Sequence, residues 1–313
     1  MPRREEVQEA FARIQPYIHQ TPVLTSAQIN KIAGGNLFFK CENLQKAGAF
    51  KTRGAMNATL SLSPDRHRAG LATHSSGNHA QALARAAMIT RTKAWIVMPN
   101  TAPEVKVNGV RSYQGEIVFC EPTLQAREDT LEQITKETGA TFVHPYNDIH
   151  VITGQSTAAF EMFTQCPPLH LMLCPVGGGG LLSGTLLARN YFSPQTKVIA
   201  CEPEGANDAW QSFYTKKLVP SLNPNTIADG LLTSLGSLTF PIISKYADDI
   251  VTVSDEAIVK AMRLVWERMK IVIEPSAAVC LAAILEEKID ITGKRTGIIL
   301  TGGNVDLNKL PWL

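Results

Sequence analysis

The sequence predicts an α/β protein whose open, mainly parallel sheets are covered by helices. Short apolar, β-rich runs alternate with amphipathic segments of helical length, which is the pattern of βα units. The alternation resumes after Asn147 and continues to the last apolar run, at residues 297–303. No Pro/Ser-rich linker divides the chain. We therefore expect parallel sheets with helices on both faces, and any second domain must be built into the first.

The predicted elements follow one another in strand and helix pairs. In the first half these pairs are 36–42 with 51–62, 70–75 with 78–89, 93–98 with 103–113, and 116–119 with 124–135. In the second half a helix at 154–165 precedes the strand and helix at 169–176 and 181–190, the strand at 197–203, the helices at 254–270 and 276–288, and the final strand.

Composition and charge exclude several classes of protein. Thirty Lys and Arg residues against twenty-eight Asp and Glu residues give a formal net charge of +2, and no basic run could follow a phosphate backbone, so nucleic acid is not an expected partner. The first fifteen residues lack the apolar core of a signal peptide, and no stretch reaches membrane-spanning length. We expect a cytoplasmic protein whose six cysteines are free thiols, since no pair has CxxC spacing.

A run of four glycines, Gly177, Gly178, Gly179 and Gly180, lies between an apolar strand and a helix. Ligands of open parallel sheets bind outside the carboxyl ends of the strands. Free backbone N–H groups at a helix N-terminus there would surround an anion, which predicts a phosphate-binding loop. A glycine-rich turn for tight strand and helix packing is the alternative. The dinucleotide fingerprint fails because Ser183 replaces its third glycine, so a single phosphate on a smaller cofactor fits better.

Lys51 lies at the predicted start of a helix, next to Phe50. Partial burial and the helix dipole would both lower the pKa of its ammonium group. A neutral amine is what Schiff-base chemistry requires. Most lysines in the first turn of a helix are simply solvated, so the hypothesis depends on the glycine loop as well.

Four motifs, GAFKTRGA, SSGNHAQA, VGGGG and TGGN, together resemble the fold type II pyridoxal-phosphate enzymes, specifically the serine racemase and serine/threonine dehydratase group. The resemblance spans nearly the whole chain. It implies the tryptophan synthase β-like fold, with two open, mainly parallel sheets flanked by helices. It also implies a large cofactor-binding domain from residues 1–69 and 148–313, and a small mobile domain from residues 70–147.

The same resemblance assigns the residues around pyridoxal 5'-phosphate. Lys51 would hold the cofactor aldehyde, Phe50 would pack beside the pyridine ring, and Asn78 would hydrogen-bond the phenolic oxygen. The four glycines would hold the phosphate. Thr301 falls where this group usually has a serine facing the pyridine nitrogen, and a strand-end hydroxyl in a turn is its structural alternative. A neutral hydroxyl there would leave the ring nitrogen largely unprotonated, which favours expulsion of a β-leaving group.

The segment SSGNH is the expected substrate loop. Ser75, Ser76 and His79, with Asn78 and backbone N–H groups, would bind the substrate carboxylate. By resemblance, Ser76 is the second catalytic residue, which exchanges a proton on the face of the substrate opposite Lys51. Helix capping by the serines and a buried structural role for His79 are the alternatives.

Two further expectations also depend on the resemblance. Arg127 matches an arginine that can reach the substrate carboxylate, with solvated helix surface as its alternative. Glu202, the carbonyl of Ala206 and Asp208 form an oxygen set suited to Mg²⁺, Ca²⁺ or Mn²⁺, with helix capping and solvation as the alternative.

The sequence thus predicts a pyridoxal-phosphate-dependent serine/threonine ammonia-lyase with serine racemase as a second activity, acting on a small hydroxy amino acid as a homodimer. A 3-hydroxyaspartate ammonia-lyase is the alternative within the family and would need an additional cationic contact for the distal carboxylate. A non-catalytic nucleotide-binding module is the alternative outside it.

Overall fold

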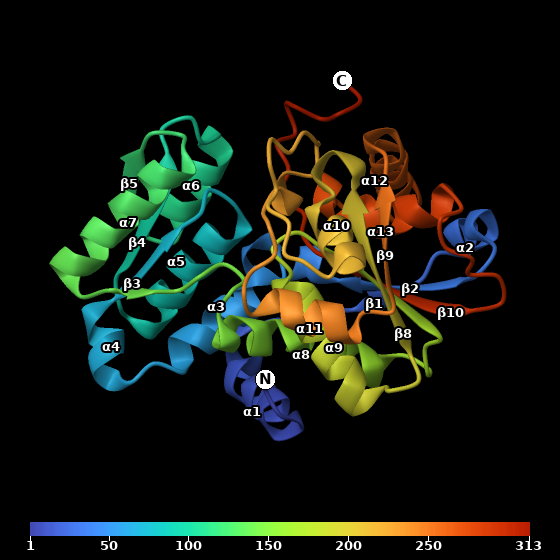
Figure 1. Ribbon diagram of the computed structural model, residues 1–313, viewed down its shortest axis with the longest axis horizontal. Coiled ribbons are helices and arrows are strands. Elements are labelled where there is room, and N and C mark those ends of the chain that lie inside the picture. The colour runs from blue at the N-terminus through green and yellow to red at the C-terminus, as the bar shows by residue number, and fades with distance from the viewer.

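The computed structural model describes residues 1–313 and contains two separate sheets (Figure 1). The larger sheet has the strand order β1-β2-β10-β7-β8-β9, and all neighbouring strands are parallel except β1 and β2. Its strands are β1 (Val23–Leu24), β2 (Asn36–Cys41), β7 (Leu171–Pro175), β8 (Lys197–Pro203), β9 (Asp249–Val253) and β10 (Arg295–Leu300).

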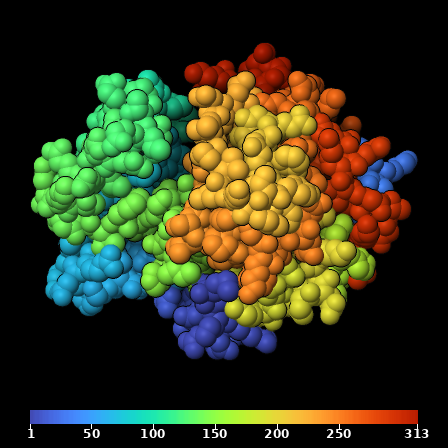
Figure 2. All heavy atoms as spheres, viewed as in Figure 1, coloured from blue at the N-terminus to red at the C-terminus, as the bar shows by residue number.

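The smaller sheet is wholly parallel and has the strand order β5-β4-β3-β6. Its strands are β3 (Leu71–His74), β4 (Ala94–Pro99), β5 (Glu116–Cys120) and β6 (Thr141–Phe142). These strands all lie within residues 70–147, the segment for which we propose a small mobile domain. In the space-filling view the cyan and green part of the chain and the yellow to red part form two masses side by side (Figure 2).

Helices cover the faces of both sheets. They are α1 (Arg4–Ile14), α2 (Ala27–Ala33), α3 (Lys51–Leu60), α4 (Pro64–Ala69), α5 (Asn78–Thr90), α6 (Glu104–Ser112), α7 (Leu124–Thr138), α8 (Ile149–Gln165), α9 (Gly180–Phe192), α10 (Asp208–Thr215), α11 (Thr239–Tyr246), α12 (Asp255–Met269) and α13 (Pro275–Leu285). The predicted fold class is therefore confirmed, and every predicted strand and helix is present. No helix combines the length and the apolar character needed to cross a membrane.

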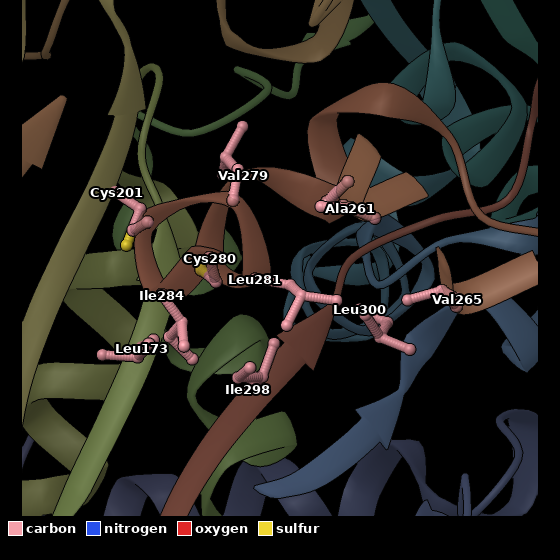
Figure 3. Close-up of a cluster of buried hydrophobic side chains, with 14 of the residues drawn as sticks. Leu173, Cys201, Ala261, Val265, Val279, Cys280, Leu281, Ile284, Ile298 and Leu300 are labelled. Atoms are coloured by element: carbon pink, nitrogen blue, oxygen red, sulfur yellow. The ribbon is translucent and has the colours of Figure 1, made fainter. Parts of the chain in front are cut away.

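The larger sheet has a hydrophobic core on each face, one under helices α12 and α13 and one under helices α8, α9 and α11. Leu173 of β7 and Ile298 of β10 are buried together with Leu281 and Ile284 of α13 (Figure 3). Helix α13 carries apolar residues on all sides, as expected for a helix packed against a sheet and covered by another helix. All six cysteines are free, as predicted.

Helix α8 lies between α3 and α9, and both contacts are made through glycine. A Cβ atom on Gly154 would lie 2.6 Å from the Arg53 carbonyl oxygen, and a Cβ atom on Gly184 would lie 2.6 Å from the backbone nitrogen of Ser156. Backbone therefore touches backbone at both crossings. Because α3 begins at Lys51, this packing fixes the helix that carries the proposed Schiff-base lysine.

A buried ionic network also holds α3. The Arg53 guanidinium donates to both carboxylate oxygens of Glu42 at 2.7 and 2.8 Å and to both of Glu161 at 2.8 and 2.9 Å. Lys40 donates to Glu161 at 2.6 Å, and the side chains of all four residues are at most 1% exposed. The two positive and two negative side chains give the buried network no net charge.

Candidate functional site

Segments that follow the carboxyl ends of strands from both sheets meet at one place. Residues 45–51 follow β2, residues 301–304 follow β10, and residues 75–78 follow β3 of the smaller sheet. The Phe50 N–H donates to the Thr301 carbonyl at 3.0 Å, and the Asn304 amide donates to Asn78 at 2.8 Å. The site predicted from the ends of parallel strands is therefore assembled across the two sheets.

Lys51 is the first residue of α3 and is half-buried at this meeting point. Its amine donates to the Pro145 carbonyl at 2.9 Å and lies 5.2 Å from the centre of the Phe50 ring. Burial lowers the pKa of the Lys51 ammonium from 10.5 to about 8, although the nearby Glu274 carboxylate opposes the shift. The neutral fraction of the amine at neutral pH is thus larger than that of an ordinary lysine, which favours Schiff-base chemistry.

The four glycines lie between β7 and α9 and are all buried. Gly179 precedes α9 with φ +85°, a conformation that glycine adopts without strain. A Cβ atom on Gly178 would lie 2.4 Å from the Tyr146 ring, so the loop must be glycine for that ring to pack on it. The first N–H groups of α9 have no partner within the helix and can bind an anion. A phosphate group fits this loop.

Thr301 and Asn78 have positions that suit the roles expected from the resemblance. Thr301 is 4% exposed, directly follows β10 and touches the start of α3 through its carbonyl. Asn78 begins α5 and is half-buried, with its amide bonded to Glu274 and Asn304. Together with Lys51 and the glycine loop, these residues offer groups that fit pyridoxal phosphate: an amine, a loop of free N–H groups, a hydroxyl and an amide.

The serine loop, residues 75–77, connects β3 to α5. Ser75 and Ser76 are half-buried, and α5 has Gly77 as its N-cap with no side-chain cap. The Ser75 hydroxyl accepts only a long hydrogen bond, 3.4 Å, from the Gly77 N–H. Neither serine therefore caps the helix, and the capping alternative has no support. The hydroxyls and the free N–H groups at the start of α5 can meet a carboxylate.

His79 has the contacts of a buried structural residue. It is 2% exposed, and one ring nitrogen bonds the Val143 carbonyl at 3.1 Å. Burial and the charge of Lys51 lower the pKa of His79 to about 3, so the ring is neutral. A neutral ring must donate Nε2–H to that carbonyl, which leaves Nδ1 buried without a partner. These contacts favour the buried structural role over a substrate contact.

Arg127 lies on α7, away from the contacts that surround Lys51. It is half-buried, and its Nε–H is buried without a hydrogen-bond partner. Its charge lies close enough to His74 to lower the pKa of that residue, although burial is the larger cause. His74 directly precedes Ser75, so Arg127 is near the serine loop and retains an unused donor.

Of the predicted metal ligands, Glu202 lies near the end of β8, and Ala206 and Asp208 follow that strand. Glu202 accepts the backbone N–H groups of Ala209 and Trp210 at 3.0 and 2.8 Å, so it caps α10 as the alternative interpretation expected. Asp208 is 3% exposed and both its carboxylate oxygens are buried without partners. Burial raises the pKa of Glu202 to about 9 and that of Asp208 to about 6. The orphaned oxygens of Asp208 are not explained by capping, and carboxylate oxygens are ligands that a hard divalent cation accepts.

Sequence reasoning did not assign Glu274, Asn304 or Tyr146 to the site. Glu274 is 4% exposed and bonds Asn78, Asn304 bonds Asn78 from the other side, and Tyr146 packs on the glycine loop. A signal for Glu274 was present, because it is the one acidic residue in the apolar segment IVIEPSAAVCLAA. A lone carboxylate in such a segment is expected to have a specific partner.

The chain is similar over nearly its whole length to known pyridoxal-phosphate-dependent enzymes. The family model described as pyridoxal-phosphate dependent enzyme matches residues 14–302. The β-hydroxyaspartate dehydratase of Paracoccus denitrificans (strain Pd 1222) is 48% identical and covers 100% of this chain and 99% of its own. The crystal structure of serine racemase from Dictyostelium discoideum is 48% identical with a TM-score of 0.93, covering 97% of this chain and 98% of that one. The crystal structure of a threonine deaminase from T.th. is 41% identical with a TM-score of 0.92, covering 98% and 99%.

Proposed function

We propose that this chain, which belongs to the pyridoxal-phosphate-dependent enzymes of fold type II, is a serine/threonine ammonia-lyase that also racemises serine. The observation that carries the proposal is the amine of Lys51, which donates to the Pro145 carbonyl at 2.9 Å, next to the Tyr146 that packs on the glycine loop, and whose pKa burial lowers to about 8. A nucleotide-binding module would have no use for such an amine.

In the proposed reaction the hydroxy amino acid is the only reactant, and the products are a 2-oxoacid and ammonia. For serine the products are pyruvate and ammonia. Pyridoxal phosphate, when bound, supplies an electron sink for the bond that breaks at the substrate α-carbon. Lys51, Asn78, Thr301 and the glycine loop would hold it. The N–H groups at the start of α5, with Ser75, would hold the substrate carboxylate and orient the α-carbon.

Two groups would move protons at the α-carbon. Lys51 Nζ would take the α-proton of the L-isomer, and a pKa near 8 suits a base that works close to neutral pH. Racemisation also needs a proton on the opposite face, for which we propose Ser76 Oγ. Elimination from L-serine needs only the first of these groups, so the two activities should separate on substitution of Ser76.

The experiment is a substrate panel with the reconstituted enzyme. L- and D-serine, L- and D-threonine and the isomers of 3-hydroxyaspartate are incubated separately, and 2-oxoacid, ammonia and enantiomer ratio are measured. Ser76→Ala should lose interconversion of the serine isomers while retaining part of L-serine dehydration. Undiminished racemisation would remove Ser76 from the mechanism, and no product from any hydroxy amino acid would refute the proposed function.

A 3-hydroxyaspartate ammonia-lyase is the second candidate, favoured by the dehydratase relative at 48% identity. The distal carboxylate of that substrate needs a cation. Arg127 has an unpartnered Nε–H, whereas Lys106 is already paired with Asp229. Arg127→Met should therefore lower kcat/KM for 3-hydroxyaspartate far more than for serine if this candidate is correct, and an equal effect on both would reject it.

We also propose that Glu202, Asp208 and the carbonyl of Ala206 hold a divalent cation, with water completing its shell. Mg²⁺, Ca²⁺ and Mn²⁺ all suit an all-oxygen set. The support for this site is the pair of orphaned Asp208 oxygens beside a second buried carboxylate. The site does not contact Lys51, so the cation would act on the fold and not on the reacting atoms.

A further inference from the structure

A buried carboxylate next to the site has no part in the mechanism described above. Glu274 is the N-cap residue of α13, yet its side chain makes no capping hydrogen bond. It turns away from the helix and accepts the Asn78 amide N–H, with Nδ2 lying 2.8 Å from Oε1 and 3.1 Å from Oε2. At 4% exposure this carboxylate is costly to bury, so a specific role is expected of it.

The oxygen of the Asn78 amide also has a hydrogen-bond partner. Asn304 Nδ2 donates to Asn78 Oδ1 at 2.8 Å and to the Ala47 carbonyl at 2.8 Å, which fixes the Asn304 amide in turn. A flipped Asn78 amide would place its NH₂ against the NH₂ of Asn304 and its oxygen against a carboxylate. Only one orientation of Asn78 is therefore compatible with both neighbours. In that orientation Nδ2 faces Glu274 and Oδ1 faces Asn304.

Two glycines allow these partners to approach. A Cβ atom on Gly302 would lie 2.6 Å from Glu274 Oε1 and 3.1 Å from Asn78 Nδ2. A Cβ atom on Gly48 would lie 2.5 Å from Asn304 Oδ1. Backbone hydrogen bonds join the same segments. The Glu274 N–H donates to the Gly302 carbonyl at 3.0 Å, and the Gly303 N–H donates to the Gly48 carbonyl at 2.9 Å.

We propose that Glu274 is a positioning residue that, through its hydrogen bond to Asn78 and together with Asn304, fixes the orientation of the Asn78 amide in which it would hold the cofactor. The inference rests on the cofactor-binding role proposed for Asn78. It adds that this role depends on a carboxylate that itself touches neither cofactor nor substrate.

The charges around Glu274 are consistent with this role. Lys51 on α3, Lys106 on α6 and Asp229 in the short helical turn at residues 229–231 are the charged groups that act on it. Burial, with Asp229, raises the pKa of Glu274 to about 7, whereas Asn78 and Lys106 oppose the shift. The Asn78 hydrogen bond thus favours the ionised carboxylate, which is the stronger acceptor.

The test is a double-mutant cycle read out as cofactor affinity. Full-length protein is reconstituted with pyridoxal phosphate, and the dissociation constant is measured by equilibrium dialysis for Asn78→Ala, Glu274→Met and the double variant. Glu274→Met removes the acceptor at similar volume and should raise the dissociation constant roughly tenfold. Added to Asn78→Ala, it should change the dissociation constant little further, because its effect passes through Asn78.

Two further variants sharpen the result. Glu274→Gln keeps an acceptor oxygen and should restore much of the affinity that Glu274→Met loses. Glu286→Met makes the same substitution at the other end of α13, where the carboxylate bonds Ser254, and should leave cofactor affinity unchanged. The thermal midpoint of cofactor-free protein is measured for all variants and should be no lower for Glu274→Met than for wild type.

Three results would overturn the inference. They are unchanged affinity in Glu274→Met, additive effects of the Glu274 and Asn78 substitutions, and a loss of affinity matched by a loss of cofactor-free stability. If Asn78→Ala itself leaves the affinity unchanged, the proposed role of Asn78 fails and the inference about Glu274 fails with it, whereas the ammonia-lyase activity is tested separately by the substrate panel.

Discussion

Arg53→Met should destabilise the protein severely. The guanidinium donates to Glu42, Glu161 and Thr157 and satisfies all five of its N–H groups. Methionine leaves one excess negative charge among side chains that are at most 1% exposed. Breaking a buried ion pair from one side costs about 3–5 kcal/mol. Because domains have a free energy of unfolding of about 5–15 kcal/mol, this substitution removes a large part of it.

The assay is urea unfolding followed by circular dichroism, with thermal melting as a second measurement. A loss of about 3–5 kcal/mol corresponds to a fall in the melting midpoint of roughly 6–20 °C for a chain of this size. Arg263→Met is the matched control, because Arg263 pairs with Glu267 on the surface, where the side chains are 60% and 47% exposed. Such pairs contribute about 0–1 kcal/mol. An Arg53→Met variant no less stable than this control would refute the reasoning.

Four further predictions follow from the site. Lys51→Ala should lose essentially all turnover and all cofactor trapped by borohydride, measured by product formation and absorbance; retained activity would reject the Schiff-base role. Chelation should lower the thermal midpoint of wild type but not of Asp208→Asn, since a cation that binds only the folded state stabilises it; equal midpoints throughout would remove the metal. Gly178→Ala should cost about 1–3 kcal/mol and weaken cofactor binding, because its Cβ would lie 2.4 Å from the Tyr146 ring; dialysis and melting test both. In cofactor-free protein the pKa of Glu274 is about 7 when folded and near 4.5 when unfolded. The free energy of unfolding of wild type should therefore fall by up to about 3 kcal/mol, relative to that of Glu274→Gln, as pH rises from 4.5 to 7. Urea midpoints of the two proteins that stay parallel across that range would contradict the raised pKa.

The sequence was sufficient for the fold and for the residues that carry local signatures. Lys51 follows an aromatic residue at a helix start, and the four glycines separate a strand from a helix, so each can be located without neighbours. Strand β9 was not among the predicted elements, although Asp249–Val253 pairs with β8 at the sheet edge. Its partly exposed residues lack the continuous apolar pattern that identified the buried strands.

Residues whose role depends on distant partners could not be assigned. Glu274 and Asn78 are 196 positions apart in sequence, and only the fold places the Asn78 amide against the Glu274 carboxylate. Pairs of interpretations were also left open where both are physically reasonable. For His79 the contacts support a buried structural role, because a hydrogen-bond partner distinguishes the two interpretations where residue type does not.

The glycine contacts of α8 bear on how this enzyme could be engineered. A methyl group on Gly154 or Gly184 would meet backbone atoms at 2.6 Å, and backbone cannot rotate aside as a side chain can. Libraries that randomise this helix stack should therefore return few folded variants, whatever the selection applied. Diversity aimed at new substrates should therefore leave both glycines of this helix stack unchanged.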